Sequence, residues 1–127
     1  MTDLQSGTEL ARPFIPARDL ELSKRFYVRL GFEKVLDGDV AVFRVGRGGF
    51  ILTRFHEVEN FMMQLMVDDL NAWWTHITSL DLENEFGVPA PRAPAMQPWG
   101  LRGAYVIDPS DVLWHVAERR PGVPQDA

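Results

Sequence analysis

Few residues in this sequence have the type and spacing of a known catalytic or metal-binding motif. The chain has no cysteine, which excludes thiolate zinc sites, cysteine nucleophiles and disulfides. It has no nucleophile elbow and no zinc-ligand spacing, and Gly46-Arg47-Gly48-Gly49 is expected to be a hairpin loop because it opens no helix. Two histidines, His56 and His76, are expected to be exposed. The third, His115, lies in a predicted strand, where a lone histidine is either a hydrogen-bonded structural residue or a ligand contact.

A loop and hairpin precede and contain His115. The loop is Gln97-Pro98-Trp99-Gly100, followed by predicted strands at Arg102–Ile107 and Val112–Ala117. Asp108-Pro109-Ser110-Asp111 lies between the two strands, and Asp-Pro with small polar residues is a hairpin signal. Trp99 on this proline-stiffened loop can stack on a flat ligand or fill an interface between two chains.

Composition limits the classes of protein to consider. A chain of 127 residues is the size of one domain with a real core. The net charge is −5 with acidic and basic residues interspersed, so we expect no nucleic-acid partner. We also expect a cytoplasmic protein with no membrane association, because the sequence shows no signal pattern and no apolar run of membrane-spanning length.

The first half of the chain predicts one helix among four strands. Asp19 can cap the first turn of the helix, and Gly31 ends it. Leu22, Phe26 and Leu30 form one apolar stripe. The strands are predicted at Ala11–Ala17, Phe32–Leu36, Val40–Val45 and Phe50–Phe55.

The second half repeats this pattern. Asp19-Leu20 matches Asp69-Leu70 at an offset of 69 − 19 = 50 residues, and periods of this size mark duplicated units. The remaining elements are a strand at Phe61–Val67, a helix at Leu70–Leu80, a poor strand at Phe86–Arg92 and a proline-rich loop at Ala93–Gly100, before the hairpin. The sequence therefore predicts an α+β fold: one domain over residues 1–127 with two tandem β-α-β-β-β modules, at about 11–56 and 61–118.

Several of these segments together resemble the vicinal oxygen chelate superfamily. They are Arg18-Asp19-Leu20, Phe26-Tyr27, Leu30-Gly31-Phe32-Glu33, Val67-Asp68-Asp69-Leu70, Trp99-Gly100 and Ile107-Asp108-Pro109. Ile15-Pro16-Ala17-Arg18-Asp19 and Gln97-Pro98-Trp99-Gly100 look most like its bleomycin-resistance branch. The resemblance implies paired modules that curl mixed sheets around a cavity, in a homodimer.

The resemblance also implies where a metal would bind. Glyoxalases and dioxygenases of the superfamily hold a divalent ion with four side chains, whose positions correspond here to Arg12, Thr53, Met62 and His115. Arg12 has no lone pair to offer, Thr53 is a poor ligand, and the thioether of Met62 suits copper(I). Because one imidazole does not hold a catalytic divalent ion, we expect no metal, no cofactor and no catalytic residue, as in the bleomycin-binding members.

Strand alternation and this resemblance predict the residues that line the cavity. They are Arg12, Phe14, Thr53, Phe55, Met62, Gln64, Met66, Trp99 and His115. Phe55, Met62 and Met66 have an alternative role as plain core. Arg12 meets either an acidic residue or a ligand carboxylate or carbonyl.

The expected function is metal-free binding of a bulky, partly aromatic small molecule, with bleomycin-like compounds as candidates, in a groove between two chains, giving antibiotic resistance by sequestration. The alternatives are a metal-dependent lyase or dioxygenase with an atypical site, and a structural or regulatory dimer whose cavity is filled.

Overall fold

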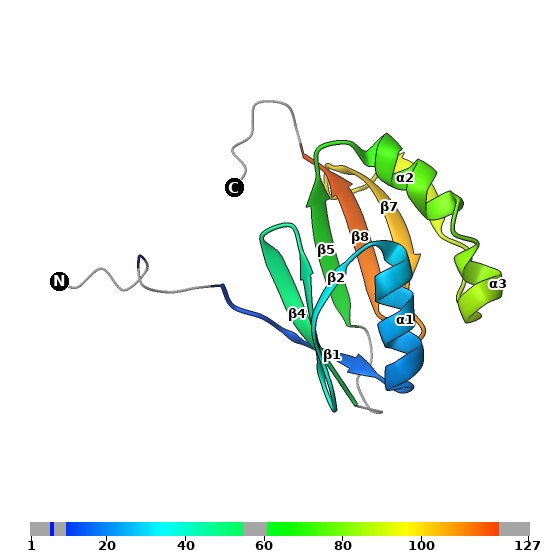
Figure 1. Ribbon diagram of the computed structural model, residues 1–127. Helices are drawn as coiled ribbons and strands as arrows, with labels where there is room; N and C mark the ends of the chain where they lie inside the picture. The colour runs from blue at the N-terminus through cyan, green and yellow to red at the C-terminus, as the bar shows by residue number, and fades with distance from the viewer. Residues whose placement is uncertain (1–5, 7–9, 55–60, 120–127) are drawn as a thin grey trace.

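Two β-α-β-β-β modules follow one another along the chain, and each forms a four-stranded sheet with helices on one face (Figure 1). This computed structural model describes residues 6, 10–54 and 61–119. The first module contains β1 (Phe14–Ala17), α1 (Leu20–Leu30), β2 (Glu33–Asp37), β3 (Ala41–Val45) and β4 (Gly48–Arg54). The second contains β5 (Met62–Val67), α2 (Leu70–Thr78), α3 (Leu82–Phe86), β6 (Arg92–Met96), β7 (Arg102–Ile107) and β8 (Leu113–Glu118).

The two sheets have the same topology, which confirms the predicted fold class. Sheet A has the order β1-β4-β3-β2 and sheet B has the order β5-β8-β7-β6. In each sheet the first strand of the module runs parallel to its last strand, and the other neighbours are antiparallel. Among the described residues, no helix is long and apolar enough to span a bilayer.

Matching caps begin the principal helix of each module. The Asp19 carboxylate accepts a hydrogen bond from the Leu22 amide at 3.1 Å, and the Asp69 carboxylate accepts one from the Ala72 amide at 2.9 Å. Helix α1 ends at Gly31, whose φ of 108° is left-handed. The caps therefore lie at the offset of 50 residues that the sequence predicts.

The structure corrects several predicted boundaries. The strand predicted at Phe86–Arg92 is wrong, because Phe86 ends the unpredicted helix α3 and the strand, β6, begins only at Arg92 and runs into the predicted loop. Asp81 before α3 is left-handed (φ 53°) and makes no side-chain cap, so the usual N-terminal signal is missing. Strand β6 contains Pro94 and is an edge strand, where a missing amide is tolerated. Helix α2 ends at Thr78 rather than Leu80.

A buried hydrogen-bonded contact joins the two modules. The Tyr27 hydroxyl on α1 donates to Asp108 Oδ2 at 2.6 Å, and Trp114 Nε1 on β8 donates to the Tyr27 oxygen at 3.0 Å. The other carboxylate oxygen of Asp108 accepts from the amides of Ser110 and Val112 at 2.7 and 2.9 Å. We call Tyr27, Asp108 and Trp114 the inter-module clasp.

Aromatic packing surrounds the clasp. The Tyr27 ring lies 4.8 Å from Phe50 and 5.9 Å from Trp114 between ring centroids, and Trp114 also contacts Phe32 at 5.3 Å. All four side chains are almost completely buried. The helix-covered faces of both sheets thus form one shared core.

Further contacts cross between the modules nearer the surface. His76 on α2, which the sequence places at an exposed position, is half-buried and donates from Nε2 to the Leu30 carbonyl at 2.8 Å. The Arg18 amide donates to Ser110 Oγ, and its guanidinium pairs with Asp111 at 2.8 Å. The imidazole thus satisfies a carbonyl at the C-terminus of α1, where orphan acceptors are expected.

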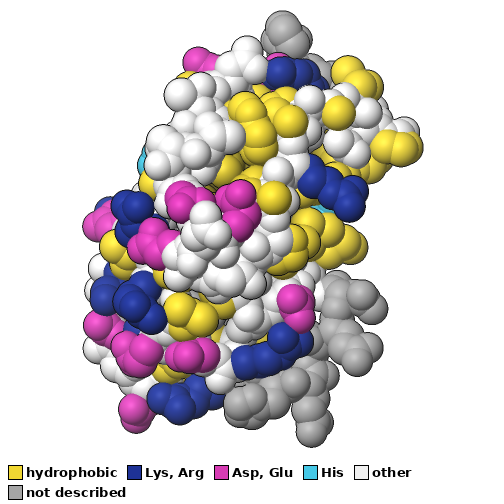
Figure 2. Space-filling model, turned by 90° about the vertical axis from the view of Figure 1, so that its right-hand side faces the viewer, with side chains coloured by type: hydrophobic (Ala, Val, Ile, Leu, Met, Phe, Trp, Pro, Cys, Tyr) yellow, Lys and Arg dark blue, Asp and Glu magenta, His cyan; other side chains and the backbone are white. Residues whose placement is uncertain are grey.

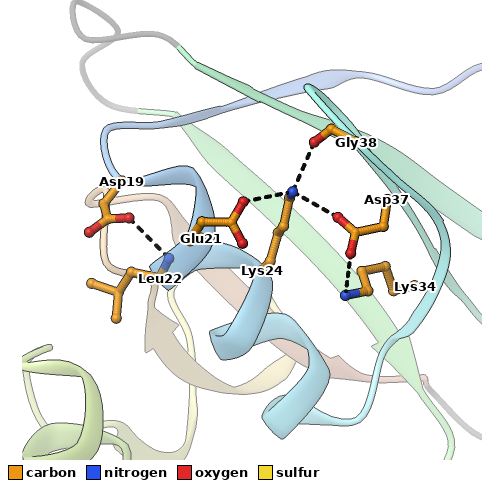
Figure 3. Close-up of polar contacts among 7 residues, drawn as sticks. All are labelled: Asp19, Glu21, Leu22, Lys24, Lys34, Asp37 and Gly38. Carbon is orange, nitrogen blue, oxygen red and sulfur yellow. Dashed lines mark hydrogen bonds and ion pairs between the residues drawn. The ribbon is translucent and has the colours of Figure 1, made fainter.

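A buried lysine anchors α1 to the turn after β2 (Figure 3). Lys24 Nζ pairs with Glu21 at 3.0 Å and Asp37 at 2.7 Å, and donates to the Gly38 carbonyl at 2.8 Å. The hydrogen bonds to Asp37 and Glu21 raise the pKa of Lys24. Hydrogen bonds from Lys24 and Lys34 lower the pKa of Asp37. The Lys24 ammonium group is therefore structural, because two carboxylates and a backbone carbonyl accept its hydrogen bonds.

Removing the clasp hydroxyl tests how strongly it joins the modules. Tyr27→Phe should lower the free energy of unfolding by about 1–3 kcal/mol, because it leaves the buried Trp114 N–H and the Oδ2 atom of Asp108 without partners. Urea unfolding at fixed protein concentration measures the change. The control is Tyr105→Phe, which removes a part-buried hydroxyl and should cost less than about 1 kcal/mol. Equal losses in the two variants would contradict a special role for the clasp.

The clasp also predicts a pH dependence. Burial raises the pKa of Asp108 from its ordinary 3.8 to about 6, against the opposing effect of its hydrogen bonds. The folded protein therefore holds this proton more tightly than the unfolded chain. Its stabilising contribution is fully present below pH 3.8 and is lost as the pH rises through about 6. Relative to Asp108→Asn, the wild type should lose up to about 3 kcal/mol of unfolding free energy across this window. Parallel pH profiles for the two proteins would contradict the assignment.

Candidate functional site

Each sheet has one face covered by helices and one open face. On β8, Trp114 and Val116 are buried in the shared core, whereas Leu113 and His115 on the other face are half-buried. On the open face of sheet A, Phe14 is 56% exposed. The open faces carry most of the residues predicted to line the cavity: Phe14, Thr53, Met62, Gln64, Met66 and His115.

Three aromatic rings gather on the open face of sheet B. The His115 ring lies 4.8 Å from the Tyr105 ring and 5.7 Å from the Trp99 ring between centroids, edge to face in both cases. The indole of Trp99 also lies over Gly103, since a β-carbon at that glycine would be 3.6 Å from its Cη2 atom. Trp99 remains 42% exposed. The cluster therefore presents an aromatic surface that is partly packed and partly available to a ligand.

Gln97 holds the Trp99 loop in place. Its side-chain amide donates to the carbonyls of Ala95 and Gly103 at 3.1 and 3.3 Å, and its oxygen accepts from the Tyr105 hydroxyl at 2.7 Å. Its backbone closes the loop with Leu101 and Gly100 at 2.9 Å each. Trp99 is therefore held by a hydrogen-bonded loop before any ligand arrives.

Tyr105 was missed as a candidate from the sequence, although the hairpin contains a signal for it. The pairing of Ile107 with Leu113 places Tyr105 directly opposite His115 on the same face. Once the Asp108–Asp111 turn is predicted, cross-strand neighbours follow from counting away from it.

His115 presents a neutral imidazole to this face. Burial lowers its pKa below the ordinary 6.5, so the ring is uncharged at pH 7. Nδ1 is buried and has no hydrogen-bond partner among the described residues. Nε2 is therefore the ring nitrogen available to a ligand.

A groove lies next to this cluster, between the β3–β4 hairpin and β5. Its volume is about 420 Å³. Gln64 and Met66, two of the predicted residues, line it together with Phe50, Trp114 and Arg119. Gln64 is also the direct neighbour of His115 across the β5–β8 ladder. Gln64 thus belongs to the groove and borders the aromatic cluster, whereas Trp99, Tyr105 and His115 do not line the groove. Met62, at 61% exposure, also lies outside it.

The remaining predicted residues occupy other positions. Arg12 precedes β1 instead of lying within the first strand, which begins at Phe14, and it is exposed. Phe55 lies outside the residues that the structure describes. Thr53 lies on β4 opposite Pro16 of β1, in the other sheet from His115.

The side chains at the superfamily's metal positions do not fit a divalent ion. Arg12 has no lone pair, and Thr53 and Met62 are poor ligands for zinc, iron or manganese. A ligating histidine usually donates its other ring nitrogen to an acceptor, but Nδ1 of His115 meets none among the described residues. In the described part of the chain, no three His, Asp or Glu side chains come together as candidate ligands.

Charges are mixed on the helix side of the molecule. Figure 2 shows basic and acidic side chains interspersed over this face, with hydrophobic side chains gathered mainly in its upper part. Several of these charges form ion pairs, including Arg29 with Glu85 at 3.2 Å. The face shown has no basic stripe of the kind that binds nucleic acid.

Known proteins are similar to this chain in fold and in sequence. No protein-family model matches the chain. A bleomycin resistance protein from Klebsiella pneumoniae is 32% identical over 113 residues, covering 84% of this chain and 89% of the relative. The crystal structure of a bleomycin-binding protein complexed with bleomycin superimposes with a TM-score of 0.76 at 28% identity, covering 89% of this chain and all of that one. A bleomycin resistance determinant encoded on the transposon Tn5 superimposes with a TM-score of 0.75, also at 28% identity, over 89% of this chain and 99% of the other. The chain therefore belongs to the bleomycin resistance proteins of the vicinal oxygen chelate superfamily.

Proposed function

We propose that this protein binds a bulky, partly aromatic drug of the bleomycin type and sequesters it without chemical change, giving antibiotic resistance. The observation that carries this proposal is the Trp99–Tyr105–His115 cluster on the open face of sheet B. A solved relative with a TM-score of 0.76 is complexed with bleomycin, which supports the choice of ligand.

The geometry suits binding better than catalysis. Trp99 offers an exposed ring for stacking, and the flexible thioethers of Met62 and Met66 adapt to ligand shape. Gln64 and neutral His115 supply hydrogen-bonding groups that orient the ligand. Arg12, Phe14, Thr53 and Phe55 belong to the first module and complete the proposed binding residues. No group in this set requires a metal or cofactor.

We also propose that two copies of the chain form the binding groove. The helix-covered faces are already packed against each other within one chain. The open faces retain large exposed apolar side chains, including Phe14 at 56%, Leu36 at 53% and Met62 at 61%. Exposed apolar patches of this kind mark binding or association surfaces. A second copy covering them would place the first module of one chain opposite the second module of the other.

Titration with bleomycin tests the ligand. Saturable quenching of tryptophan fluorescence is expected at micromolar protein, because the drug would stack on Trp99. Trp99→Leu should raise the Kd about fivefold or more, the equivalent of about 1 kcal/mol of aromatic contact. Trp99→Phe should retain most of the affinity. The control is Trp73→Phe on α2, which should change neither the Kd nor the quenching. The absence of any saturable change in the wild type would exclude bleomycin as the ligand.

Light scattering tests the dimer. The molar mass in solution should be twice the 14.5 kDa of one chain. Phe14→Glu should shift it toward the monomer, because a charge would be buried in the covered face. Val28→Glu is the matched control, since Val28 is 48% exposed on α1, away from the open faces, and should leave the mass unchanged. Dissociation by the second variant alone would place the interface on the helices instead.

A further inference from the structure

A single row of polar side chains crosses the open face of sheet B. The strand register aligns Arg92 of β6 with Tyr105 of β7, Tyr105 with His115 of β8, and His115 with Gln64 of β5. Apolar or small residues form the rows on either side. One flanking row is Ile107, Leu113 and Met62, and the other is Ala95, Gly103, Ala117 and Met66. A polar row between two apolar rows favours one orientation of a bound ligand, with its polar groups along the polar row.

The row has a cation at one end and neutral groups along the rest. Arg92 is exposed and forms no hydrogen bond or ion pair with another described residue, and its guanidinium is a cation with five N–H donors. Its neighbour Tyr105 donates its hydroxyl proton to Gln97. Beyond it, His115 is neutral, and Gln64 is an uncharged amide with no partner among the described residues.

The lack of a partner distinguishes Arg92 from many other arginines of this acidic chain. Arg18, Arg29, Arg44, Arg102 and Arg119 each pair with a carboxylate. Arg92 instead keeps its five donors free beside an aromatic cluster. A planar guanidinium of this kind matches a carboxylate through two parallel hydrogen bonds.

Distances along the row suggest the size of the group that would fit. Neighbouring strands lie about 4.8 Å apart, so two spacings from Arg92 to His115 span roughly 10 Å. Trp99 lies over Gly103, which belongs to the neighbouring row, and its ring packs against His115. A flat bicyclic aromatic ring packed against Trp99 and His115 would therefore place an attached carboxylate within reach of the long Arg92 side chain.

We propose that the open face of sheet B selects a flat aromatic ligand that bears a carboxylate, with the ring against Trp99 and His115 and the carboxylate on Arg92. The proposal rests on the proposed ligand-binding role of this face and adds a second class of ligand, aromatic acids, beside the drug proposed above. Arg92 is then the residue that determines charge specificity. The neutral His115 beside it adds a hydrogen bond without a second charge.

Matched probes of one shape test this selection. Naphthalene-2-carboxylate and naphthalene-2-carboxamide share the same ring and nearly the same shape, but only the first is charged, and ligand-observed NMR titration at low salt gives a Kd for each. The wild type should bind the carboxylate about fivefold more tightly, as expected for a solvent-exposed ion pair. Arg92→Gln should weaken carboxylate binding to the carboxamide level without changing carboxamide binding, and Arg92→Lys should restore part of the preference. Raising the salt concentration should reduce the preference in the wild type.

The control variant is Arg25→Gln. Arg25 is also exposed and has no partner among the described residues, but it lies on α1. This variant should keep the full preference for the carboxylate. The proposal is overturned if the wild type binds both probes equally, if Arg92→Gln keeps the preference, or if neither probe binds saturably.

Bleomycin titration of the same samples separates this proposal from the proposed function. Loss of bleomycin binding alongside an Arg92-dependent carboxylate preference would remove the drug assignment and leave this inference intact. Tight bleomycin binding with no charge preference between the probes would do the reverse.

Discussion

The packing of both helix-covered sheet faces into one core is the constraint on which the rest of the structure depends. Tyr27 from the first module hydrogen-bonds Asp108 of the second, and Trp114 donates to the same hydroxyl. Phe50 and Phe32 close around these groups. A buried polar group costs free energy unless it is paired, so the clasp fixes one relative position of the modules. Because that core uses the covered faces, the opposite faces are left open.

This arrangement explains why the candidate binding residues alternate with core residues along the same strands. On β8, Trp114 supports the core while His115 meets Trp99 and Tyr105 on the other side. A substitution at either residue therefore changes a different property of the protein, because adjacent strand positions face opposite environments. The hairpin that carries Asp108 also sets the register that pairs Tyr105 with His115.

Sequence reasoning predicted the elements whose signals are local. The caps at Asp19 and Asp69, the stop at Gly31 and the β7–β8 hairpin are each specified by a few neighbouring residues. Helix α3 and strand β6 were missed because Asp81 lacks a side-chain cap and Pro94 lies inside an edge strand. The face assignments on β5 and β8 followed from alternation, but His76, Gln97 and Arg92 were not identified as contact residues. His76 meets a carbonyl distant in sequence, and the position of Arg92 depends on a bulge in β6 that shifts the register. Gln97 gains its role from the way the loop returns it to Gly103 and Tyr105.

The open face of sheet B combines a rigid part with an adaptable one, and the difference bears on how it gains affinity. Gln97 holds the Trp99 loop by bonds to Ala95, Gly103 and Tyr105, so stacking on Trp99 requires little ordering of the loop on binding. The methionines Met62 and Met66 lie on β5 but have flexible thioether side chains. The part of the face around Trp99 is fixed and discriminates between ligands by shape and charge. The part that carries the methionine side chains is flexible and tolerates variation in the rest of the ligand. Selectivity on this face should therefore reside in the group bound beside Trp99, with broader tolerance for what is attached to it.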